Sequence, residues 1–99
     1  MIPKQEITLP VKYNEIDQQT RKLIREMYVQ QQNGLCQHCN LPLTELPIES
    51  MKQYPINKSL FPETMFIYPV HLHHSRVTGL TIGAVHAYCN AYLWQYKGE

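Results

Sequence analysis

The sequence lacks three things: a long apolar run, a strong excess of one charge and an even number of cysteines. None of its apolar stretches approaches the roughly 18 residues that a membrane-spanning helix needs, so we expect no membrane partner. The net charge is only +1 with histidine neutral, which argues against a strongly basic protein that coats DNA. Residues 1–10 contain no apolar core of the signal-peptide type, so we expect a cytoplasmic protein.

The cysteine count and the chain length both point to an additional source of stability. Three cysteines cannot all pair as disulfides within one chain. In a reducing compartment such cysteines are more often free, reactive or metal-bound. The chain has 99 residues, which allows one domain that buries only about 60–65% of the surface its unfolded form exposes. A core this thin gains from a staple such as a metal ion.

Apolar periodicity and turn residues divide the chain into four segments of one α+β domain. We expect an extended arm, a helix with a tight knuckle after it, a proline-rich loop, and a strand–turn–strand–helix unit. These segments cover residues 1–13, 15–40, 41–64 and 65–98, respectively.

Within these segments, apolar residues at helical spacing predict a helix over 15–32, with Asn14 or Asp17 as its cap. A short helical turn is expected over 49–54, inside the proline-rich loop.

The last segment predicts two strands, over 65–73 and 80–85, followed by a closing helix over 87–96 that ends at Gly98. We expect Phe66 and Tyr68 to pack the first of these strands on the closing helix.

The first helix carries three cations close together, Arg21, Lys22 and Arg25. Two interpretations fit them. They form either an ordinary solvated helix face or a patch that contacts DNA phosphates.

Two short motifs, Cys36-x2-Cys39 and His86-x2-Cys89, account for every cysteine in the chain. Each presents two ligand atoms from a single turn, and together they make the Cys3His set that tetrahedral structural Zn²⁺ takes. Such an ion would clip both ends of the long loop and supply on the order of 10 kcal/mol towards folding. A lone C-x2-C is also a redox motif, but no thioredoxin-like strand–helix pattern surrounds this one. The other interpretation is that His86 and Cys89 are ordinary core and helix-start residues.

A histidine cluster, His71-Leu72-His73-His74, ends the first predicted strand. Strand alternation would place His71 and His73 on one face and His74 on the other. Neutral imidazoles suit a divalent transition metal, and histidine is a natural base near neutral pH. Asn90 directly follows the last zinc-type cysteine, and its amide oxygen could be a further ligand. The pattern indicates a metal site with open positions for a phosphate.

The stretch from His73 to Asn90, H-H-S-R-V-T-G-L-T-I-G-A-V-H-A-Y-C-N, resembles the ββα-metal (HNH, His-Me finger) endonucleases. It is similar in particular to the phage endonuclease VII-like branch, whose motif D-H-D-H-x-T-G-x-x-R-G-L-L-C-x-x-C-N follows an upstream C-x2-C. The resemblance implies a small zinc-stapled ββα-metal domain preceded by an N-terminal helix. It also implies that His86 takes the place of the third zinc cysteine.

The resemblance further implies a metal-dependent endonuclease that hydrolyses DNA phosphodiester bonds, by nicking or cleaving. His74 falls on the position of the general base. His73 falls on that of a metal-binding aspartate, and Asn90 matches a metal-ligand asparagine. His71 would supplement this ligand set.

Three departures from the motif bear on its chemistry. Ser75 and Arg76 stand where an acidic residue and a second histidine are usual, and Ile82 replaces an arginine. Arg76 would help to neutralise the phosphate. Histidine at position 73 softens the site, which shifts the expected catalytic ion from Mg²⁺ towards Mn²⁺, Ni²⁺ or Zn²⁺.

The partner implied by the resemblance is DNA, double-stranded or branched, in the cytoplasm of a bacterium or a phage-infected host cell. A short domain reads little sequence, so a homodimer or a structure-selective substrate is also among the expectations. The alternative is a non-catalytic, zinc-stabilised module that binds nucleic acid or protein.

Overall fold

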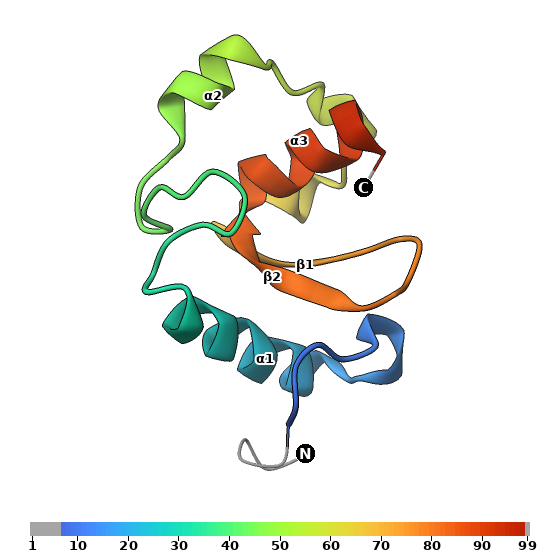
Figure 1. The fold of residues 1–99 in the computed structure, drawn as a ribbon. Helices are drawn as coiled ribbons and strands as arrows, with labels where there is room; N and C mark the ends of the chain where they lie inside the picture. The colour runs from blue at the N-terminus through green and yellow to red at the C-terminus, as the bar shows by residue number, and fades with distance from the viewer. Residues whose placement is uncertain (1–6, 99) are drawn as a thin grey trace.

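A two-stranded antiparallel hairpin forms the centre of the fold in the computed structural model, which describes residues 7–98 (Figure 1). Helix α1 lies on one side of the hairpin, and helix α3 lies on the other. The elements in chain order are α1 (Gln18–Gln31), α2 (Ile48–Gln53), β1 (Val70–His74), β2 (Thr81–His86) and α3 (Ala87–Lys97). This is a small mixed α+β domain, as the sequence predicts.

Helix α1 starts three residues later than expected, because Tyr13–Glu15 forms a separate 3₁₀ turn. Asp17 caps the helix, and its carboxylate accepts a hydrogen bond from the Thr20 backbone N–H at 2.7 Å. Residues 1–6 of the expected arm lie outside the described residues. Further along the arm, Lys12 forms a single antiparallel bridge with Leu80, just before β2.

The first strand is shorter than the predicted 65–73. Glu63–Phe66 folds as a 3₁₀ turn, and β1 begins only after Pro69, which has no N–H to donate to a sheet. Tyr68 is 66% exposed, so the expectation that it packs on the closing helix is wrong. Phe66 reaches α3 indirectly, because its ring contacts Phe61, whose ring in turn contacts Trp94.

The other predicted elements agree with the structure to within about a residue. The second strand is β2, the helical turn in the proline-rich loop is α2, and the closing helix is α3. Helix α3 ends at Gly98, whose φ of 74° is the left-handed conformation that favours glycine at a helix end. None of the helices described over residues 7–98 is long and apolar enough to span a membrane.

The hydrophobic core lies between α1 and the hairpin and continues into the cysteines. Ile24 of α1 and Val85 of β2 are fully buried, as is Cys36, and Cys89 is 1% exposed. The candidate zinc ligands are therefore part of the core.

The Gln32 side chain pairs with the hairpin as a short strand would. Its amide oxygen accepts from the Ala84 N–H, and its amide nitrogen donates to the Ala84 carbonyl, both at 2.9 Å. This pairing needs a glycine at position 83, because a β-carbon there would lie 2.8 Å from Gln32 Oε1 and 2.8 Å from Gln37 Cγ.

We therefore expect Gly83→Ala to destabilise the domain by about 1–3 kcal/mol, the usual cost of overpacking a filled site. The Gln32 amide is held by its two bonds to Ala84 and cannot swing away without breaking them. Urea unfolding should show a lower midpoint with an unchanged slope. An unchanged midpoint would show that the Gln32 pairing is not fixed.

Candidate metal centre and active site

The four ligand atoms of Cys36, Cys39, His86 and Cys89 lie within 4.8 Å of one another. Nδ1 of His86 is 3.4 Å from Sγ of Cys39 and 3.6 Å from Sγ of Cys89. Two ligands of one zinc ion, bound at about 2.3 Å (sulfur) and 2.0–2.1 Å (nitrogen), are about 3.5–3.8 Å apart. The predicted Cys3His set is therefore a group that could hold a structural metal ion such as Zn²⁺.

Two tight turns bring these ligands together. Cys36 and Cys39 come from the knuckle after α1, where the Cys39 N–H points at Sγ of Cys36 at 3.5 Å. His86 ends β2, and Cys89 lies in the first turn of α3. The Gln37 N–H donates to the Ala84 carbonyl at 2.9 Å, which fixes the knuckle against β2.

A hydrogen bond on the far side of its ring prepares His86 to bind a metal. Its Nε2 lies 2.9 Å from the Pro42 carbonyl, which can only accept, so Nε2 carries the proton. Nδ1, which faces the three sulfurs, is then left with a lone pair. Metal-bound histidines commonly show such a bond from the second ring nitrogen.

The surroundings shift the pKa values of the three thiols in opposite directions. A hydrogen bond from the Cys89 thiol lowers the pKa of Cys36 to about 4, and the same pairing raises the pKa of Cys89. Burial and the neighbouring Cys36 charge raise the pKa of Cys39. Zinc favours thiolate over thiol at all of its sulfur ligands.

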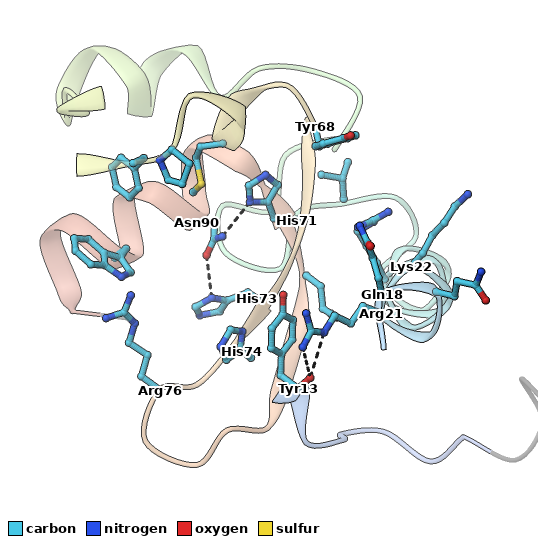
Figure 2. A pocket seen from close by; sticks show the side chains of 18 of the residues that line it. Tyr13, Gln18, Arg21, Lys22, Tyr68, His71, His73, His74, Arg76 and Asn90 are labelled. Atoms are coloured by element: carbon cyan, nitrogen blue, oxygen red, sulfur yellow. Dashed lines mark hydrogen bonds between the residues drawn. The ribbon is translucent and has the colours of Figure 1, made fainter. Parts of the chain in front are cut away.

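Asn90 follows the zinc-type Cys89 directly, and its amide joins two of the clustered histidines (Figure 2). Its Nδ2 donates to Nδ1 of His71 at 3.0 Å, and its Oδ1 lies 3.3 Å from Nδ1 of His73. The sequence predicted that these three residues meet, and the structure brings them together. Any ion held by the Cys3His set would fix the backbone from which Asn90 projects.

His74 lies in the same groove as His71 and His73, and not on the opposite face as strict strand alternation predicts. The ladder shifts register between His73 and His74, and such bulges re-aim side chains. Burial first, and then the charges of His73, Arg21 and Arg76, lower the pKa of His74. Burial also lowers the pKa of His71. Both imidazoles are therefore held towards the neutral form.

These histidines lie on the floor of a groove of about 1120 Å³. Four of the nine lysine and arginine residues line it, namely Arg21, Lys22, Arg25 and Arg76. Within residues 7–98, no aspartate or glutamate side chain lines this groove. The chain is nearly neutral overall, with a net charge of +1, but four of its cations are concentrated in this groove.

The groove cations lie on two opposite sides (Figure 2). Arg21, Lys22 and Arg25 come from α1, whereas Arg76 follows β1 and places its guanidinium 4.7 Å from the centre of the Trp94 ring. Lys22 is exposed and Arg25 half-buried. Arg21 differs from these two, since its Nε and Nη2 donate to the Tyr13 carbonyl at 3.3 and 3.1 Å.

Sequence reasoning missed one residue of this site, Tyr13, whose ring stacks on the His74 imidazole with centroids 3.9 Å apart. The two residues are far apart in the sequence, and no spacing pattern joins them. Of the five histidines, His38 lies outside the groove and contacts the Tyr92 ring.

Comparison of the chain with protein-family models, curated proteins and solved structures finds no match.

Proposed function

We propose that this chain is a metal-dependent endonuclease of the HNH type that hydrolyses DNA phosphodiester bonds. One observation carries the proposal: three histidines and Asn90 lie together in a groove whose charged lining residues, within residues 7–98, are all cations. A strand–strand–helix order, with His74 ending β1 and Asn90 on α3, supports the same assignment. The groove charge supports a polyanionic substrate.

The spacing of the His73 and Asn90 atoms fits a divalent ion, which would displace the proton that Nδ1 of His73 donates to Oδ1 of Asn90. Nδ1 of His73 and Oδ1 of Asn90 are 3.3 Å apart, and two ligands bound at about 2.1–2.3 Å to one ion lie about 3.0–3.4 Å apart. His71 lies beside them, and its Nδ1 would have to release the hydrogen bond that it accepts from Nδ2 of Asn90 to become a further ligand. A divalent ion bound here would stabilise the negative charge that develops on the phosphate.

The protein side chains would perform the remaining steps. His74, whose pKa burial lowers, takes a proton from a water molecule, and the resulting hydroxide attacks phosphorus. The bond to the 3′-oxygen breaks, and that oxygen gains a proton from solvent, which leaves a 5′-phosphate and a 3′-hydroxyl. Arg76, Lys22 and Arg25 hold the flanking phosphates, whereas Arg21 is bonded to the Tyr13 carbonyl.

The experiment is a supercoiled-plasmid nicking assay with zinc-loaded protein and added Mg²⁺, Mn²⁺, Ni²⁺ or Zn²⁺. We expect nicking with at least one of these ions and none when no divalent ion is added to the zinc-loaded protein. Folded, zinc-loaded protein that leaves the plasmid supercoiled with all four ions would contradict the proposal.

A non-catalytic binding module is the second candidate. It is favoured by Ile67 and Tyr68, which are 65% and 66% exposed at the start of the hairpin. Such a module would bind DNA or a protein without cutting. Slower migration of the plasmid in a mobility-shift assay, with no nicking, would favour it.

Lys22 and Arg25 are expected to bind DNA without taking part in the chemistry. Replacing both with glutamine should raise KM and leave kcat unchanged. The slope of log K against log salt should become less steep by about 0.9 for each phosphate that the protein no longer neutralises. Fluorescence anisotropy with a labelled duplex at several salt concentrations measures this slope. Lys97→Gln, at the exposed end of α3, is the matched control, and equal slopes for all variants would refute the role.

A further inference from the structure

Tyr13 belongs to the N-terminal 3₁₀ turn, outside the hairpin and helix that carry the candidate catalytic groups, yet it contacts His74 directly. The two rings are nearly parallel, with an interplanar angle of 9° and centroids 3.9 Å apart. Because the tyrosine covers a face of the imidazole, the ring edge that carries both nitrogens stays clear of the stack. Proton transfer takes place at that edge.

The backbone around Tyr13 is tied to the same hairpin that carries His74. The Tyr13 N–H donates to the Gly79 carbonyl at 2.9 Å. Val11 and Thr81 exchange two bonds: the Thr81 N–H donates to the Val11 carbonyl at 2.9 Å, and the Val11 N–H donates to the Thr81 hydroxyl at 3.1 Å. These bonds fix the backbone at Tyr13 relative to the hairpin that carries His74.

Arg21 holds the tyrosine from the α1 side. Its guanidinium carbon lies 4.0 Å from the Tyr13 ring centre, and its Nε and Nη2 donate to the Tyr13 carbonyl. In Figure 2 the tyrosine ring lies between the guanidinium and the His74 imidazole. Arginine, phenol and imidazole therefore form a three-layer stack that joins α1 to the end of β1.

Resting on the proposed nuclease function, we infer that Tyr13 and Arg21 are positioning residues that set the plane of the His74 imidazole for proton abstraction. The register shift between His73 and His74 interrupts the ladder where the base sits, so the strand alone constrains this side chain less. The stack supplies the constraint. Arg21 differs from Lys22 and Arg25 because it contacts Tyr13 in two ways. Two of its nitrogens donate to the Tyr13 carbonyl, and its guanidinium lies over the Tyr13 ring.

The test compares Tyr13→Leu, which removes the ring, with Tyr13→Phe, which keeps it. With Mn²⁺ and plasmid DNA, Tyr13→Leu should lower kcat by about 10- to 100-fold with KM unchanged, as expected for a misplaced catalytic group. Tyr13→Phe should keep kcat at the wild-type value. In the His74→Ala background, Tyr13→Leu should cause no further loss, since the two residues act as one unit.

A spectroscopic measurement tests the stack without any activity. The Tyr13 ring current should shift the His74 ring-proton NMR signals upfield in the wild type and in Tyr13→Phe, and Tyr13→Leu should return them downfield. Tyr96→Leu, on the far part of α3, is the control that should leave these signals in place.

Several results would overturn the inference. Full kcat in Tyr13→Leu, or a raised KM at unchanged kcat, would remove the positioning role while leaving the nuclease function intact. A wild-type chain that does not nick DNA with any of the four ions would remove the proposed function and this role with it. Unchanged His74 signals in Tyr13→Leu would show that the stack does not hold in solution.

Discussion

Removing the metal from the Cys3His set is expected to unfold the chain. A structural zinc site of this kind supplies on the order of 10 kcal/mol, which equals or exceeds the whole stability of most small domains. Cys36 and Cys89 are buried in the core between α1 and the hairpin, so the ligands and the apolar core would be lost together. Chelation or Cys89→Ser should abolish the cooperative thermal transition seen by circular dichroism.

The matched control for this prediction is His38→Ala, because His38 is an exposed residue of the same knuckle and is not one of the four ligands. It should keep both the transition and the metal. Mass spectrometry of protein purified without chelator should find close to one zinc per chain. A folded chain with fewer than about 0.5 zinc would contradict the structural site.

Replacing the base is expected to have the second largest effect. His74→Ala should lower kcat for plasmid nicking by about 10²- to 10⁴-fold, which is the usual contribution of a positioned general base. KM should change little, because the cations that face the phosphates remain. Added imidazole should recover part of the rate if the loss is that of a base.

The control for His74→Ala is again His38→Ala, which removes an imidazole from outside the groove. Both proteins should have the same zinc content and the same thermal midpoint. A His74→Ala protein that nicks at the wild-type rate would show that His74 is not the base.

The sequence was most informative where chemistry requires a fixed spacing. The two motifs of the Cys3His set predicted a four-atom cluster because each pair of ligands comes from one turn, and short turns have few geometries. The meeting of Asn90 with the histidines followed from the same logic, since Asn90 is adjacent to a ligand of that cluster.

The sequence was less informative where tertiary contacts decide. Phe66 and Tyr68 have strand-like character, yet Pro69 and the preceding 3₁₀ turn delay the strand to Val70. The shift that re-aims His74 is a local break in strand pairing, which alternation cannot predict. The stack of Tyr13 on His74 joins residues far apart in the chain, so no local sequence pattern predicts it.

Net charge was the least informative quantity. A value of +1 argues against strong binding to nucleic acid, but it averages over the whole surface. In the structure, α1 and the segment after β1 bring four cations to one groove, and the carboxylates of residues 7–98 lie elsewhere. What matters for binding a phosphate backbone is this local arrangement.

The most direct test of the central claim is the chemical nature of the strand breaks made by zinc-loaded wild-type protein with Mg²⁺, Mn²⁺, Ni²⁺ and Zn²⁺ added in turn. Hydrolysis with the 3′-oxygen as leaving group predicts nicks with a 5′-phosphate and a 3′-hydroxyl, which DNA ligase reseals to closed circles. Plasmid that stays supercoiled, or nicks that ligase cannot close, would contradict metal-assisted hydrolysis in this groove.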